Sequence, residues 1–131
     1  MATNPASQVQ QYGQSIWLDY IHRDDLKNGA MQRHIDAGIV GVTSNPTIFQ
    51  KAIGGSDTYD DAMRTMLDLD ANEIYEKLAI ADIQAASDLF RPVYDRTGGR
   101  DGYVSLEVSP LIAQDTDATI AEAKRLHTAV D

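Results

Sequence analysis

Hydrophobic and polar positions along the chain predict three short strands separated by helices. Apolar residues rich in β-branched and aromatic side chains gather in the ranges 15–20, 39–43 and 102–110. Helical spacing of apolar residues fills the intervals, in the ranges 23–38, 46–53, 56–69, 70–90 and in a last helix starting at Asp115 or Thr116. Residues 1–14 are polar and Gln-rich, so we expect a loose lead-in or a partly docked helix ahead of one domain over 15–131.

Turn-forming residues subdivide these helices. Asn28-Gly29 predicts a break in the first, while Arg91-Pro92 and Gly98-Gly99 predict turns after the long one. The inner face of the long helix is predicted at Ile74, Leu78, Ala81, Ala85 and Leu89. Asp82 also falls in a broad apolar arc, so it either meets a partner inside the protein or marks the edge of the buried face.

The alternation of strands and helices predicts a parallel sheet, because parallel neighbours require a crossover connection. Three such units fit either an open sheet or part of a (β/α)8 barrel. Side-chain parity favours the barrel. Each strand has one aliphatic face and a second face with a polar residue near its C-terminal end: Asp19, Asn45 and Glu107. An open sheet covered on both sides would be apolar on both faces, whereas a barrel collects functional side chains at its C-terminal rim.

Composition narrows the function without defining it. Of 131 residues, 43% are hydrophobic, none is Cys, and the net charge is −9. A chain this acidic is not expected to bind nucleic acid or an anionic membrane. The absence of Cys excludes disulfides and thiolate metal sites and is compatible with a reducing cytosol. No apolar run has the length of a membrane span.

Structural roles compete with catalytic ones for each rim residue. Asp19 could cap the next helix, Asn45 before Pro46 is typical of an Asx cap, and Glu107 could lie on a solvated edge strand. Thr43 and Ser44 are candidate substrate-binding hydroxyls, although hydrogen bonds to loop backbone explain them equally well.

Four stretches together carry a resemblance to a known family: "IWLDYI", "GVTSNPTIF", "GGSDTYDDA" and "SLEVSPLIAQDT". From about Ser15 to its last residue, the chain resembles the N-terminal part of the longer bacterial transaldolases. The resemblance implies a (β/α)8 barrel of the Schiff-base aldolase class. Such cytoplasmic enzymes move a dihydroxyacetone unit from sedoheptulose 7-phosphate or fructose 6-phosphate to an aldose phosphate in the pentose phosphate pathway, without metal or organic cofactor.

The same resemblance assigns roles by position. Asp19 corresponds to the acid/base aspartate, Asn45 to the asparagine that binds the three-carbon unit, and Glu107 to the glutamate that works through a water. The lysine nucleophile of the family lies on the fourth strand, and the chain is expected to stop just before that strand. We therefore expect about three barrel units that are inactive alone and that self-associate through exposed strand edges. The lysines present, at 27, 51, 77 and 124, all fall on predicted helices.

Two other functions stay open at this point. A different barrel lyase or hydrolase could use Asp19 and Glu107 as its carboxyl pair; a retaining glycosidase would hold them about 5–5.5 Å apart. Alternatively, the chain is a small non-catalytic α/β module that binds a partner through an exposed strand edge.

Overall fold

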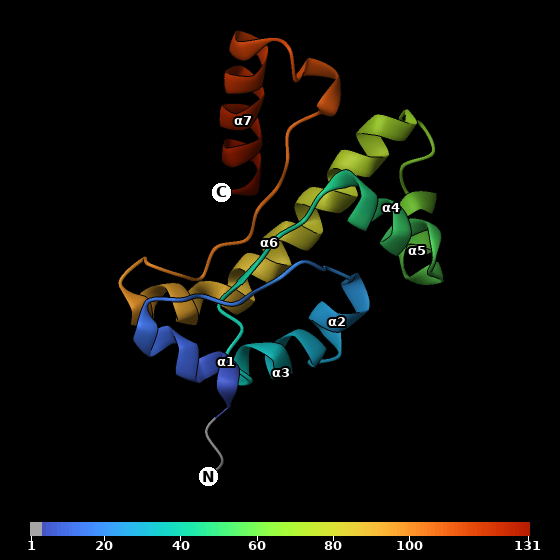
Figure 1. The fold of residues 1–131 in the computed structure, drawn as a ribbon. Coiled ribbons are helices and arrows are strands. Elements are labelled where there is room, and N and C mark those ends of the chain that lie inside the picture. Colours follow the sequence, from blue (N-terminus) through green and yellow to red (C-terminus); the bar gives the residue numbers. More distant parts are fainter. Residues whose placement is uncertain (1–3) are drawn as a thin grey trace.

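The computed structural model describes residues 4–131, in which three extended segments lie side by side and parallel (Figure 1). Strand β1 (Trp17–Leu18) pairs with β2 (Gly41–Val42), with Trp17 opposite Gly41 and Leu18 opposite Val42. On the other side of β2, Val42 forms a parallel bridge with Val104. This spatial order, first–second–third, is that of consecutive strands in a (β/α)8 barrel, and it confirms the parallel arrangement.

The regular strands are shorter than the predicted ranges 15–20, 39–43 and 102–110. β1 and β2 have two residues each, and the third segment contributes only its bridge at Val104. Isolated backbone hydrogen bonds extend the pairing: the N–H of Val40 donates to the carbonyl of Ile16, and the N–H of Gly102 donates to the carbonyl of Val40. Only the middle segment has a neighbour on each side among the described residues, so the outer segments lack the second partner that regularises a strand.

Helices account for most of the described chain (Figure 1). Their bounds are α1 Pro5–Gln8, α2 Arg23–Lys27, α3 Ala30–Asp36, α4 Pro46–Gly54, α5 Asp60–Arg64, α6 Ala71–Thr97 and α7 Thr116–Val130, with single 3-10 turns η1 Val9–Tyr12, η2 Asp57–Tyr59 and η3 Pro110–Ile112. The predicted break between α2 and α3 is confirmed: Gly29 has φ +81°, a conformation that glycine adopts without strain. The lead-in is helical over residues 5–12, and residues 1–3 lie outside the described range.

The predicted turn at Arg91-Pro92 is wrong, because α6 continues through Pro92 to Thr97. A proline inside a helix removes one N–H, so the carbonyl of Asp88 loses its helical partner. Asp88 and Pro92 are both exposed, and water can therefore satisfy that carbonyl. On the opposite side, Phe90 and Val93 are fully buried and hold this part of the helix against the core.

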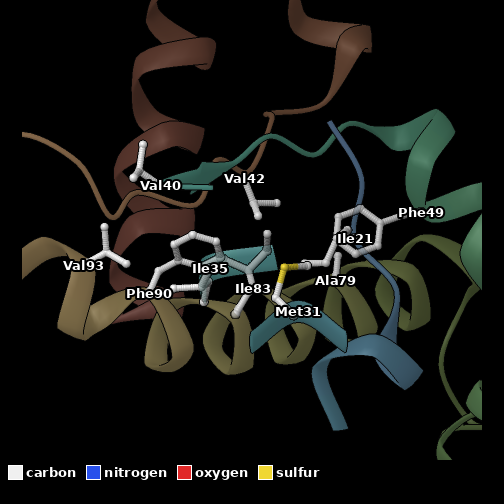
Figure 2. Close-up of a cluster of buried hydrophobic side chains, with 11 residues drawn as sticks. Ile21, Met31, Ile35, Val40, Val42, Phe49, Ala79, Ile83, Phe90 and Val93 are labelled. Carbon is white, nitrogen blue, oxygen red and sulfur yellow. The ribbon is translucent and has the colours of Figure 1, made fainter. Parts of the chain in front are cut away.

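The core lies between the sheet and the helices α3 and α6. Figure 2 shows Val40 and Val42 of the central segment facing Ile83 and Phe90 of α6. Helix α3 adds Met31 and Ile35, and α4 adds Phe49. The aliphatic face of the central strand is thus the helix-covered face, as parity predicted.

The predicted inner face of α6 is rotated from the observed one. Its buried residues are Leu78, Ala79, Asp82, Ile83, Ala86, Phe90 and Val93, whereas Ala81 and Ala85 are exposed. Asp82 accordingly lies within the buried face and not at its edge.

Asp82 is buried because it has partners on two other elements. One carboxylate oxygen accepts from Arg23 Nε at 2.7 Å and the other from the Tyr59 hydroxyl at 2.8 Å. The Arg23 guanidinium carbon also lies 4.3 Å from the centre of the Tyr59 ring. This Arg23–Asp82–Tyr59 network joins the start of α2 and the end of η2 to the middle of α6.

Helix α7 contacts α6 (Figure 1), and polar groups make part of this contact. Gln84 donates to the carbonyl of Val130 at 3.0 Å, and Arg125 makes two hydrogen bonds to Glu76 at 2.6 and 2.8 Å. Of the apolar residues on α7, Leu126 is buried, whereas Ile120 is 48% exposed. Within residues 4–131, no helix is both long enough and apolar enough to cross a membrane.

Candidate functional site

The three extended segments end next to one another at their C-terminal ends. The N–H of Thr43 donates to the carbonyl of Leu18 at 2.9 Å, and the N–H of Ser105 donates to the carbonyl of Val42 at 3.0 Å. Residues 19, 43 and 105 therefore follow in adjacent positions across the sheet, on the face opposite the buried valines. This is where a (β/α)8 barrel collects its functional side chains.

Asp19 and Thr43 are in direct contact at this rim. The Thr43 hydroxyl donates to Asp19 Oδ1 at 2.6 Å, a distance typical of a charge-assisted bond to a carboxylate. Asp19 is exposed and Thr43 is half-buried, so the second carboxylate oxygen remains accessible from the open face. A carboxylate with one oxygen held and one oxygen accessible can accept a proton from a bound substrate.

Ser44 is buried and faces the third segment. Its N–H donates to Ser105 Oγ at 3.1 Å, and its hydroxyl donates to the Ser105 carbonyl at 2.6 Å. These two bonds replace ladder pairing where the third segment is irregular. The Ser44 hydroxyl thus makes the hydrogen bond to loop backbone that the sequence left open, and a substrate-binding role for Ser44 stays a prediction.

Asn45 ends the central segment and caps α4. Its Oδ1 accepts from the N–H of Ile48 at 2.9 Å, and Pro46 occupies the first helical turn. Within residues 4–131, the amide nitrogen of Asn45 donates to no acceptor. The cap therefore fixes the side chain by its oxygen and leaves the NH₂ group as a donor for a ligand.

Glu107 lies on the exposed part of the third segment, past the last ladder bond. Its negative charge acts on Tyr75 of α6: burial of the phenol raises the pKa of Tyr75, and the nearby Glu107 carboxylate raises it further. In the described chain no side-chain hydrogen bond joins Glu107 or Asn45 to Asp19. The structure thus brings Asp19 and Thr43 together and places Asn45 and Glu107 at the same ends of the neighbouring segments.

Aromatic side chains fill the face below these polar residues. Trp17 lies over Gly41 so closely that a methyl group added at position 41 would collide with the indole ring. The Trp17 and Tyr103 rings are stacked 6.4 Å apart at 24°. Trp17 therefore fills this face of the sheet, and the need for glycine at 41 was missed from the sequence. A glycine inside a strand is the signal that could have indicated it.

Metal binding finds no support in the described residues: in 4–131 no cluster of three or more His, Asp or Glu side chains could hold an ion. His22, the histidine closest in sequence to Asp19, caps α2 by accepting from the N–H of Asp24 at 3.2 Å.

Comparison with known proteins gives a family match over most of the chain. Residues 16–131 match the family described as Transaldolase/Fructose-6-phosphate aldolase. The chain is 48% identical over 128 residues to "Transaldolase 2" of Nostoc punctiforme, covering 95% of this chain and 34% of the relative. It is 45% identical over 133 residues to a transaldolase of Trichodesmium erythraeum, covering 99% of this chain and 35% of the relative. A transaldolase of Thiobacillus denitrificans is 46% identical over 131 residues, 98% of this chain and 36% of the relative. The chain spans about a third of the length of these curated relatives.

Proposed function

Because the chain belongs to the transaldolase/fructose-6-phosphate aldolase family, we propose that it supplies the acid–base part of a transaldolase active site. The whole protein transfers a dihydroxyacetone unit from sedoheptulose 7-phosphate or fructose 6-phosphate to an aldose phosphate, through a lysine Schiff base. This reaction belongs to the pentose phosphate pathway, and the cytoplasmic location expected from the sequence stays a prediction. The observation that carries the proposal is the Thr43–Asp19 hydrogen bond at the C-terminal ends of parallel strands.

Asp19 acts as the general acid and base at the substrate hydroxyl. Cleavage of the carbon–carbon bond needs a group that takes the hydroxyl proton, and the same group returns it when the new bond forms. Thr43 holds Oδ1, so the carboxylate has a fixed orientation and Oδ2 receives the proton.

Asn45 and Glu107 serve the other steps. The free NH₂ of Asn45 donates to an oxygen of the bound three-carbon unit, adding no charge to the site. Glu107 is exposed, so a water can lie between it and the nitrogen of the Schiff base, where proton transfers accompany loss and addition of water.

The nucleophile of this mechanism is a lysine beyond the described strands. A lysine becomes nucleophilic when burial or a neighbouring cation removes its proton. The lysines of this chain, at 27, 51, 77 and 124, lie on α2, α4, α6 and α7 and are all exposed. None lies at the end of a strand, which supports our expectation that the chain alone has no transaldolase activity.

Borohydride trapping tests this expectation directly. The 131-residue chain, incubated with fructose 6-phosphate and sodium borohydride, should show no mass increase, because no lysine forms an iminium that can be reduced. The Nostoc punctiforme relative serves as the positive control. A covalent adduct at one of the chain's own lysines would mean that the assignment of the nucleophile is wrong.

A chimera tests the proposed roles. This chain replaces the stretch of the Nostoc punctiforme relative to which it is 48% identical, and transfer from fructose 6-phosphate is measured. We expect an active chimera in which Asp19→Asn and Glu107→Gln each lower kcat by about 10²–10⁴-fold, the range of general acid–base catalysis. Asp68→Asn is the matched control, since Asp68 is exposed and remote from the rim in sequence. An active chimera in which Asp19→Asn keeps full kcat would refute the proposal.

The family match also favours this function over the barrel hydrolase and the non-catalytic module considered from the sequence. Self-association stays a prediction, supported by the unpaired outer edges of the first and third segments within residues 4–131. Sedimentation velocity at several concentrations measures it, and a monomer at every concentration would contradict it.

A further inference from the structure

A groove of about 320 Å³ lies between α2, residues 62–66 and α6. It shares no residue with the proposed catalytic rim. Its apolar walls are formed by Leu26, Ala62, Met66, Leu78, Ala81 and Ala85. An engineered apolar cavity of about 150 Å³ accommodates benzene, so this groove has room for a longer hydrocarbon.

Cationic side chains gather at the same groove. Arg23, Lys27 and Lys77 line it together with Asp82, whose two oxygens are already occupied by Arg23 and Tyr59. Lys27 and Lys77 are exposed, and neither makes an ion pair in the part of the chain that the structure describes. Three cations against one anion give an excess of two positive charges, in a chain whose net charge is −9.

Arg23 leaves one side of its guanidinium available at the groove. Its side chain is only 10% exposed; Nε is bound by Asp82, and Nη2 donates to the carbonyl of Leu78 at 3.3 Å. Nη1 donates to no acceptor in residues 4–131. In that range the buried side-chain polar atom that lacks a hydrogen bond is Asp101 Oδ2, which lies 3.6 Å from Arg100 Nε, so Arg23 Nη1 is not a fully buried atom. Nη1 therefore reaches solvent, and the groove is the space that Arg23 lines.

We infer that this groove binds a medium-chain carboxylate of about eight carbons. The carboxylate accepts from Arg23 Nη1 between Lys27 and Lys77, and the hydrocarbon chain lies along the apolar walls. Free phosphate would bind the cations but would leave the apolar walls exposed to water. Charge and shape together thus select a small amphipathic anion.

Titration with octanoate, followed by amide chemical shifts of the isotope-labelled chain, tests the inference. We expect saturable shifts confined to α2, α5 and the Lys77–Ala85 part of α6. Octanol and acetate are the matched ligands, because one lacks the charge and the other the hydrocarbon. Each should bind at least about tenfold more weakly than octanoate, since both halves of the ligand contribute.

Variants separate a built site from general adsorption. Lys27→Gln and Lys77→Gln should each weaken octanoate binding about threefold to tenfold, whereas Lys124→Gln on α7 should leave it unchanged. Ala81 is exposed, so Ala81→Phe fills the groove without disturbing the core and should abolish binding. The inference is overturned if octanoate gives no saturable shifts, if octanol binds equally well, if Lys124→Gln matters as much as Lys27→Gln, or if the groove shifts follow protein concentration and not octanoate.

Discussion

Removing the Asp82 carboxylate should be among the most destabilising single changes in this chain. In Asp82→Leu, the Arg23 guanidinium stays 90% buried without its counter-ion, and the Tyr59 hydroxyl loses its acceptor. Breaking a buried ion pair by removing one partner costs about 3 to 5 kcal/mol. Because Nη1 of Arg23 reaches solvent, some of that charge can be hydrated, and we expect about 3 kcal/mol. Domains of this size unfold with about 5 to 15 kcal/mol, so the change removes a large share of the stability.

Urea unfolding followed by far-UV circular dichroism and by the fluorescence of Trp17, the single tryptophan, measures this loss. The midpoint should fall while the dependence on urea stays the same. The matched control is the double variant Arg23→Met/Asp82→Leu, which removes both charges and should recover most of the lost stability. A loss under about 1 kcal/mol for Asp82→Leu, or a double variant no more stable than the single one, would refute the reasoning.

Three further predictions concern other contacts. Gly41→Ala should lower the free energy of unfolding by about 1 to 3 kcal/mol and shift the Trp17 emission, because the new methyl group meets the indole. Gly54→Ala is the control, since a Cβ at that position has no atom within 4 Å. It should be neutral or slightly stabilising in the same urea assay. The hydrogen bonds from Arg125 lower the pKa of Glu76, so the folded state binds a proton on this carboxylate less tightly than the unfolded state does. The contact of α7 with α6 should therefore weaken as the pH falls below about 4.5. Hydrogen exchange of the α7 amides measures this, and Glu76→Gln should remove the dependence on pH. Burial, followed by the charge of Asp82, raises the pKa of Tyr59. The contribution of Tyr59 to the stability of the fold is therefore complete below pH 10 and is lost as the pH rises further. The melting temperature of Tyr59→Phe should lack this decline at high pH, and an unchanged decline would contradict the assignment.

Local signals in the sequence predicted the parallel order of the three segments and the positions of their polar ends. The parallel order of the three segments follows from the helices between them, and the polar ends of one face follow from strand parity. Asn45 shows where such reasoning leaves a choice. The Asn-Pro pair indicated a helix cap and the family motif indicated a ligand contact, and the observed geometry uses the oxygen for the first and leaves the nitrogen for the second.

Features that depend on distant residues escaped prediction. Helical spacing predicted the inner face of α6 at Ala81 and Ala85. The observed face includes Asp82, whose partner Arg23 lies 59 positions away in sequence and could not be identified from local spacing. Arg91-Pro92 predicted a turn because proline is disfavoured inside a helix, but the burial of Phe90 and Val93 outweighs that preference. Strand lengths depend on neighbours across the sheet, which sequence spacing does not reveal.

The cap made by Asn45 has a consequence for how substitutions at this position should be interpreted. Alanine would remove the cap of α4 as well as the proposed ligand contact, so a loss of turnover in that variant would have two inseparable causes. Aspartate keeps an oxygen for the Ile48 amide but has no N–H to donate to the proposed ligand, and it therefore separates the proposed ligand contact from the helix cap. One side chain here combines an observed helix cap with a proposed ligand contact.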